Sequence, residues 1–201
     1  MRWIAGFVFL LQAATLPPAY PRPGTSKLLE NNRVQVWDIS WLKQTYPLHR
    51  HRYDLIGVYY TDGDRMIVSQ QGERRPVSTK AWETAFQAKD VTHIEEGASD
   101  APLRAVFVEM KEPAATGAVD AATTPAAFPA GTGKQLRDNE RATLWEFVPA
   151  PAKGAPHRHQ RDAVVIAFNG RTPRATFVKQ GTVHADEDAA GADRLYVVEL
   201  K

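Results

Sequence analysis

Short apolar runs separated by turn residues follow one another along most of the chain. These runs are rich in Val, Ile, Tyr and Phe, which favour β-strands, and turn pairs such as Asp-Gly or Asn-Gly end several of them. Four clear runs are residues 55–60, 105–111, 163–168 and 195–201. Helical periodicity is weak, and residues 79–88 are the only modest candidate for a helix. The pattern predicts an all-β protein built as a sandwich or barrel.

The chain repeats this pattern in two halves. Each half contains, in the same order, a Trp, a His-x-His pair, an apolar run, a turn, a later His and a final apolar run. In both halves the Trp precedes the first His of the pair by 12 residues. The landmarks are Trp37, His49, His51 and His93 in the first half, and Trp145, His157, His159 and His184 in the second. A tandem duplication explains this order, and two linked barrels are its simplest structure.

The second half is shortened. Between its second and third histidines it has 17 fewer residues than the first half, which predicts the loss of two strands or of one long hairpin. A barrel shortened in this way has a thin core and an exposed edge, so we expect it to pack against the first half. The runs that follow the His pairs are apolar on both faces, as at Ile56, Val58, Val164 and Ile166. Such a sheet needs cover on both sides, which predicts either tight packing of the halves or a homodimer.

Two further segments mark the domain boundaries. Residues 1–19 contain Arg2, an apolar run too short to span a membrane, and then small residues and prolines, which is typical of a secretory signal peptide. The alternative is a first strand or helix of the folded domain. Residues 113–133 are almost all Ala, Thr, Pro and Gly, the composition of a linker. We therefore expect barrels over 28–112 and 137–201 in a protein that is exported to the periplasm or secreted, with no membrane span.

Composition excludes several kinds of site. The chain of 201 residues has no Cys, so disulfides, thiolate zinc sites, iron–sulfur clusters and cysteine nucleophiles are ruled out. Its net charge is +2, and its 25 basic and 23 acidic residues are scattered rather than gathered into a stripe, which argues against nucleic acid as a partner. The sequence also contains no phosphate loop, dinucleotide fingerprint or serine-nucleophile motif.

Histidine is the most informative residue type, because all six histidines belong to the repeated pattern. Residues i and i+2 of a strand project from the same face, so each His-x-His pair points in one direction. A later His on a neighbouring strand then completes three imidazoles on one side of a metal, with positions left open for water or substrate. We expect a divalent transition metal, one of Fe, Mn, Zn, Ni or Cu. A structural or surface His pair is the alternative, which the duplication of the whole triad disfavours.

Several residues beside the His pairs are candidates for lining or supporting the sites. Strand parity puts Tyr53 and Tyr59 on the face of the first pair. Arg161 lies on the face of the second pair, where it either holds an anionic substrate or is solvated at a barrel mouth. Asp54 and Asp162 have two interpretations. They either contact a metal-binding histidine and orient its ring, or they cap turns or pair with neighbouring arginines.

The two triads resemble the two motifs of the cupin superfamily, and their duplication resembles a bicupin. The resemblance covers about residues 30–111 and 140–201. It implies double-stranded β-helix (jelly-roll) barrels, with the six histidines as metal ligands. It also implies a small-molecule ligand or substrate.

The chain departs from the cupin pattern at two points. Cupin motifs usually have a Glu four or five residues after the second His, and the fourth position here is Leu55 in the first half and Ala163 in the second. The usual Gly three residues before the third His is Asp90 in the first half and Gly181 in the second. The resemblance is therefore more specific for fold than for chemistry.

Two functions fit this resemblance. The first is a metal-dependent enzyme, such as a dioxygenase-like oxidoreductase acting on a small polar or organic-acid substrate. The alternative is a non-catalytic exported module that binds a metal or small ligand, which the missing carboxylate favours. A structural protein whose histidines bind nothing fits least well. We expect the metal in the first half, because the longer segment between His51 and His93 can close a full barrel around it.

Overall fold

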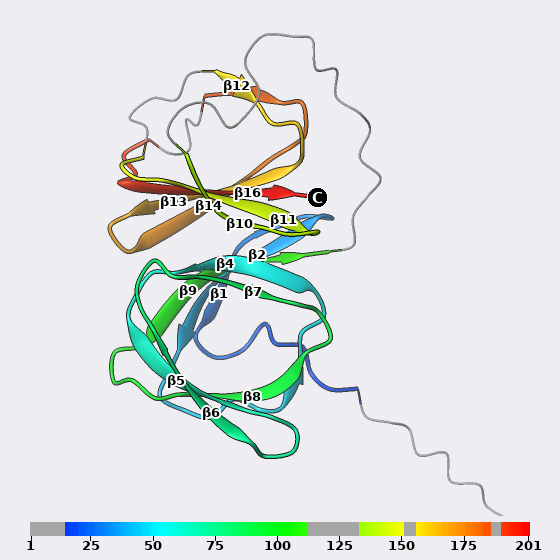
Figure 1. The fold of residues 1–201 in the computed structure, drawn as a ribbon, viewed down its shortest axis with the longest axis vertical. Helices are drawn as coiled ribbons and strands as arrows, with labels where there is room; N and C mark the ends of the chain where they lie inside the picture. Colours follow the sequence, from blue (N-terminus) through cyan, green and yellow to red (C-terminus); the bar gives the residue numbers. More distant parts are fainter. Residues whose placement is uncertain (1–14, 112–132, 151–155, 186–189) are drawn as a thin grey trace, which may run out of the picture.

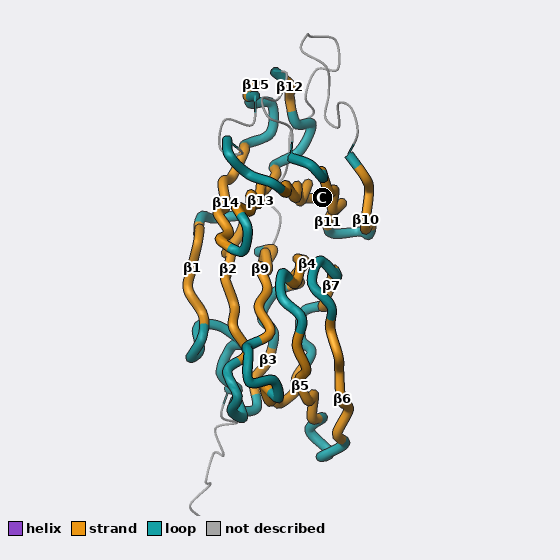
Figure 2. The backbone as a smooth tube through the Cα atoms, turned by 90° about the vertical axis from the view of Figure 1, so that its left-hand side faces the viewer, coloured by secondary structure: helices purple, strands orange, loops and turns teal. Residues whose placement is uncertain are grey.

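The computed structural model describes residues 15–111, 133–150, 156–185 and 190–201, and every regular element in these ranges is a β-strand (Figure 1). The strands form two barrels, one from each half of the chain, stacked along the long axis of the molecule (Figure 2). The all-β jelly-roll prediction is confirmed, but the modest helix candidate at 79–88 is wrong, because a strand covers Thr84–Gln87. Within the described ranges no helix is long and apolar enough to cross a membrane. The predicted linker lies outside these ranges except for Gly133.

The first barrel consists of two antiparallel sheets. The five-stranded sheet has the order β1-β2-β9-β4-β7, and the four-stranded sheet has the order β3-β8-β5-β6. The strands are β1 (Thr25–Glu30), β2 (Val34–Trp41), β3 (His49–Arg50), β4 (Asp54–Tyr59), β5 (Gly63–Val68), β6 (Arg74–Thr79), β7 (Thr84–Gln87), β8 (Thr92–Gly97) and β9 (Leu103–Met110). Apolar side chains from alternate positions, such as Ile39, Leu55 and Phe107, fill the space inside this barrel.

The second barrel repeats this plan with fewer strands. Its five-stranded sheet has the order β10-β11-β16-β13-β14, and β12 pairs with β15. The strands are β10 (Lys134–Asp138), β11 (Ala142–Phe147), β12 (His157–Arg158), β13 (Ala163–Asn169), β14 (Thr172–Val178), β15 (Val183–His184) and β16 (Arg194–Leu200). The β5–β6 hairpin has no counterpart among the described residues of this half, so the predicted loss of a long hairpin matches the structure.

The two five-stranded sheets pack face to face, and a shared apolar core lies between them. Ile56 and Val58 of β4 are buried in the same cluster as Val164 and Ile166 of β13. Further aromatic side chains join it, and the rings of Tyr60 and Phe168 lie 5.4 Å apart. The prediction that these strands are covered on both faces is confirmed, because the other barrel provides the cover. A homodimer stays a prediction.

Two reciprocal ion pairs flank this core. Arg33, directly before β2, donates to Asp162 at 2.9 Å, and Arg141, directly before β11, lies 2.8 Å from Asp54. Each carboxylate also accepts a backbone N–H from its own barrel, that of Lys89 for Asp54 and that of Gln180 for Asp162. The two aspartates therefore join the barrels and do not orient a histidine, and their arginine partners come from the opposite half of the chain.

The described part of the expected signal peptide is built into the first barrel. Pro18 bridges to Arg50, whose backbone N–H donates to the Pro17 carbonyl at 3.0 Å. Ala19 and Tyr20 are buried in the core inside the barrel. A signal peptide that ends at Ala19 is inconsistent with this packing, because its removal would take buried residues with it. Residues 1–14 lie outside the described ranges, so export stays a prediction.

Candidate metal centres

The short strand β3 brings the first histidine triad together. His49 on β3 is directly opposite His93 on β8, and His51 follows the end of β3. The three ring centroids are 4.8–5.4 Å apart, and all three side chains are buried. One ligand nitrogen from each residue lies within 4.8 Å of the other two. The structure thus gathers the three residues that the repeated pattern singled out.

Hydrogen bonding directs one nitrogen of His49 towards the centre of the triad. The carbonyl of Pro47 lies 2.9 Å from Nδ1 of His49, and because a carbonyl only accepts, Nδ1 carries the proton. Nε2 therefore has a lone pair, and it is buried without a hydrogen-bond partner among the described residues. Such an orphaned acceptor beside two further imidazoles suits a metal ion.

The spacing of the histidine nitrogens also fits a metal. Nε2 of His51 and Nε2 of His93 are 3.3 Å apart. Two nitrogen ligands at about 2.0–2.1 Å from a tetrahedral zinc ion would be roughly 3.3–3.4 Å apart. Burial lowers the pKa of His51 to about 3 and that of His93 to about 4, and it also lowers the pKa of His49. All three imidazoles are therefore neutral near pH 7, the state that binds a metal.

The turn that precedes the third histidine is the same in both barrels. Asp90 and Gly181 have φ angles of +69° and +78°, in the left-handed region. Their backbone N–H groups donate to the carbonyls of His51 and His159 at 2.7 and 3.0 Å. Aspartate tolerates this conformation better than most residues. The replacement of the usual Gly by Asp90 therefore keeps the local geometry.

The second triad has the same arrangement. His157 on β12 is directly opposite His184 on β15, and Nε2 of His157 lies 3.3 Å from Nε2 of His159. One ligand nitrogen from each of the three again lies within 4.8 Å of the others. His157 and His159 are buried, whereas His184 is partly exposed. The second site therefore also gathers three imidazoles, with the 3.3 Å distance between a different pair of them, and it is more open to solvent.

One glutamate behind the second triad and its counterpart in the first barrel were not predicted. In the second barrel Oε1 of Glu199 lies 3.5 Å from Nδ1 of His159, and Oε2 accepts from the Trp145 indole at 3.3 Å. In the first barrel Glu109 takes the corresponding position on β9 and accepts from the Trp37 indole at 2.9 Å. A carboxylate at the outer nitrogen of a histidine is the arrangement expected behind a metal ligand. Two features of the sequence could have pointed to these glutamates: the equal spacing of Trp and His in the two halves, and the Val-Glu pair repeated near the end of each half.

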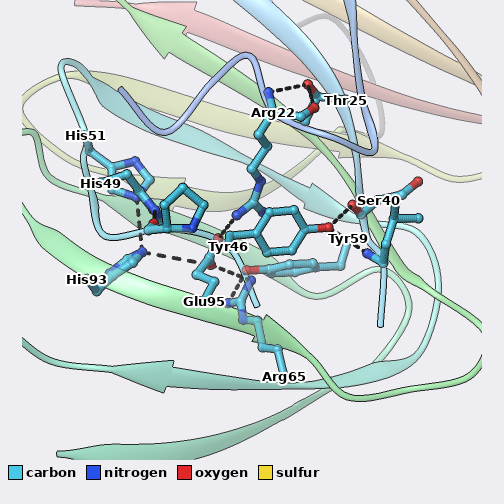
Figure 3. A network of polar contacts seen from close by, with 12 residues as sticks. Arg22, Thr25, Ser40, Tyr46, His49, His51, Tyr59, Arg65, His93 and Glu95 are labelled. Atoms are coloured by element: carbon cyan, nitrogen blue, oxygen red, sulfur yellow. Dashed lines mark hydrogen bonds and ion pairs between the residues drawn. The ribbon is translucent and has the colours of Figure 1, made fainter. Parts of the chain in front are cut away.

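Glu95 is a buried carboxylate that lies beside the first triad, inside the barrel. It lies two residues after His93 on β8, so it faces the same side of the sheet, and its Oε1 is 3.9 Å from Nε2 of His93. Figure 3 shows Glu95 between His93 and two arginines, Arg22 at 2.7 Å and Arg65 at 3.8 Å. Burial alone would raise the pKa of Glu95, but these two guanidiniums lower it to about 2. Glu95 is therefore an anion held beside the histidines.

A cavity of about 160 Å³ opens beside the first triad. Its polar lining includes His51, His93, Glu95, Tyr59 and Arg65, and its apolar lining includes Leu55, Phe86 and Phe107. Tyr59 thus lines the cavity as strand parity placed it. Tyr53, in the bend before β4, is half-buried and is not among the lining residues. Arg161 is exposed in the turn before β13, which matches its interpretation as a solvated arginine.

Comparison with known proteins finds a solved structure with a similar overall fold. No family model and no curated protein sequence matches this chain. Among solved structures, AerE from Microcystis aeruginosa aligns over 93% of this chain and 97% of its own, at 10% identity and a TM-score of 0.62. A cupin domain from Bordetella pertussis aligns over 46% of this chain and 98% of its own, at 23% identity and a TM-score of 0.40. A cupin 2 conserved barrel protein from Leptotrichia buccalis aligns over 88% of both chains, at 13% identity and a TM-score of 0.47.

Proposed function

We propose that this chain, which has the fold of the cupin superfamily in two tandem barrels, binds a divalent transition metal at His49, His51 and His93 and acts there on a small molecule. The observation that carries the proposal is the convergence of three buried, neutral imidazoles, two of which have Nε2 atoms 3.3 Å apart. The proposal includes the second triad as a further metal site. It is the more open of the two.

In the first barrel, some residues would bind the metal and the ligand, and others would exclude water from the site. A metal held by three imidazoles would supply Lewis-acid or redox chemistry at its open positions. Glu95 keeps its charge at neutral pH and would accept a hydrogen bond from a bound ligand. The apolar walls at Leu55 and Phe107 would exclude water from one side of that ligand. A dioxygenase-like oxidoreductase is the reaction class that we favour within this proposal.

A non-catalytic, ligand-binding module is the second candidate. Leu55, at a position where cupin motifs usually have Glu, lines the cavity, so its wall is apolar there. A site with three histidines and no carboxylate ligand at this position would still bind a metal and a small molecule. Absence of turnover with metal-loaded protein and a bound ligand would favour this candidate.

Metal analysis of variants tests the proposal. We expect His49→Ala/His51→Ala to remove most of the metal from protein purified without an affinity tag, because one imidazole does not hold a divalent ion tightly. Replacing His157 and His159 in the same way should remove less.

The matched control is Arg50→Ala/Arg52→Ala, which changes two exposed residues of the same segment and should leave the metal content unchanged. Circular dichroism would show that each variant is folded. Loss of metal only from the second pair would reverse the assignment of the main site. Unchanged metal content in both folded variants would contradict the proposal.

Export is part of the proposal as well. The apolar run near the N-terminus supports it, with cleavage before Pro17, whose carbonyl accepts a hydrogen bond from the barrel. Intact-mass measurement of the protein recovered from the periplasm or medium tests this, and a retained Met1 would contradict it.

A further inference from the structure

The cavity beside the first triad carries an excess of positive charge. Two arginines face one carboxylate there: Arg22 lies 2.7 Å from Glu95, and Arg65 is farther away, at 3.8 Å. Arg22 therefore neutralises Glu95, and the charge of Arg65 is not fully compensated. Arg75 also lines the cavity and is exposed, so it lies where the cavity meets solvent. A buried cationic wall of this kind attracts an anion.

Arg65 is held rigidly and has hydrogen-bonding capacity to spare. Its Nη2 donates to the Tyr59 hydroxyl at 2.6 Å, and its guanidinium lies over the rings of Trp41 and Tyr59 at 4.9 and 5.0 Å. Nη1 of Arg65 lies 3.8 Å from Glu95, which is too far for a hydrogen bond, so its N–H groups are not taken up by that carboxylate. The Tyr59 oxygen accepts from Arg65, which leaves its own O–H to donate. Together the two side chains offer a preorganised pair of donors for a planar anion.

We infer that this cavity binds a small monocarboxylate, with the carboxylate against Arg65 and Tyr59 and the apolar part against Phe86 and Phe107. The inference rests on the proposed function in one respect: it takes this ligand to be the small molecule that binds beside the metal-binding histidines. The cavity of about 160 Å³ is close in size to an engineered apolar cavity of about 150 Å³ that holds benzene. A ligand with about as many non-hydrogen atoms as benzene therefore fits inside this cavity.

The position of Arg65 also places the ligand's carboxylate near the triad. Oε1 of Glu95 lies between Nη1 of Arg65 and Nε2 of His93, at 3.8 and 3.9 Å (Figure 3). The guanidinium and the imidazole thus lie on opposite sides of a single carboxylate oxygen. A short acid whose carboxylate binds Arg65 therefore lies beside the triad, and its carboxylate does not need to bind the metal.

Calorimetric titration with butanoate and its neutral isostere butanamide tests the inference. Both probes fit the size limit, and only butanoate has the charge. We expect butanoate to bind EDTA-treated and zinc-loaded protein alike, and butanamide to bind at least tenfold more weakly. Arg65→Met should weaken butanoate binding by about tenfold to a hundredfold, the usual value of a charge-assisted hydrogen bond. The matched control is Arg74→Met on the neighbouring strand, an exposed arginine paired with Glu96.

A second variant covers the case in which Arg65→Met does not fold. Tyr59→Phe keeps the buried ring and removes only the hydroxyl, and it should also weaken butanoate binding relative to the wild type. Butanoate binding that needs zinc and does not change in folded Arg65→Met or in Tyr59→Phe would overturn the inference and leave the proposed metal site intact. Butanoate binding to a protein that never retains zinc would support the inference and count against the proposed function. Equal binding of butanoate and butanamide would overturn the inference.

Discussion

Glu109 is a buried acid whose protonation should make the stability of the protein depend on pH. The side chain is 4% exposed, and its burial raises the pKa to about 7 from an ordinary value of 4.5, although the Trp37 indole N–H opposes this. The folded protein therefore keeps a proton that the unfolded chain releases between pH 4.5 and 7. Stability from this group is complete below pH 4.5 and is lost as the pH rises to about 7.

The size of this effect follows from the shift in pKa. Each unit is worth 1.36 kcal/mol, so the free energy of unfolding should fall by about 3 kcal/mol across the window. Glu109→Gln keeps an oxygen that accepts from Trp37 and removes the titration. The variant should therefore gain about 3 kcal/mol over the wild type between pH 4.5 and pH 8.

Urea denaturation of both proteins at intervals from pH 4.5 to 8 measures this difference. EDTA in every sample removes any stabilisation by bound metal, and all other ionisable groups are the same in both proteins, so their contribution cancels. Glu140→Gln, which changes an exposed acid, should show a constant difference from the wild type. Two results would refute the reasoning. In one, the difference in free energy of unfolding between Glu109→Gln and the wild type also stays constant with pH. In the other, this difference shifts in favour of the wild type between pH 5 and pH 8.

Two further pairs of substitutions test how the barrels are joined and how closely β4 packs against β9. Asp162→Ala leaves Arg33 buried without its partner and should cost about 3–5 kcal/mol in chemical denaturation, whereas Asp100→Ala, which breaks an exposed pair, should leave the stability almost unchanged. Equal costs would contradict a joining role for Asp162. Gly57→Ala places a Cβ against the backbone of β9 and should prevent soluble expression or sharply lower the Tm. At Gly72 an added Cβ meets no atom within 4 Å, so Gly72→Ala should cost only about 1–2 kcal/mol for its positive φ, and a Tm loss as large as that of Gly57→Ala would refute the argument.

The histidine triads and the missing hairpin were predictable because both depend on short-range order along the chain. In a strand the positions i and i+2 share a face, so His49 and His51 had to point together. The second half has fewer residues between its second and third histidines, and these missing residues correspond to the complete β5–β6 hairpin of the first half. A hairpin at the edge of a sheet can be lost as a unit because the pairing of the remaining strands stays intact. The apolar residues on both faces of β4 and β13 likewise required cover.

The contacts that were missed join residues far apart in the sequence. Glu109 reaches Trp37 across the pairing of β2 with β9, and that register is set only when the barrel closes. Asp54 and Asp162 find their arginines in the opposite barrel, so neighbours in sequence such as Arg161 were the wrong partners. The N-terminal segment around Ala19 lacks the alternation of a strand, and its prolines suggested that it lies outside the barrels. Its packing depends on a space inside the barrel that periodicity along the chain does not reveal.

The reciprocal pairing of Arg33 with Asp162 and of Arg141 with Asp54 has an evolutionary consequence. In an interface between two identical subunits, a contact from residue i to residue j is always matched by one from j to i. The same rule holds here between two halves of one chain, as it would if a single-barrel dimer had been fused. Within a true dimer, any deletion alters both copies at once. Once the copies are joined, one can lose a hairpin while the other keeps its cavity, so the fused chain is free to specialise one site and simplify the other.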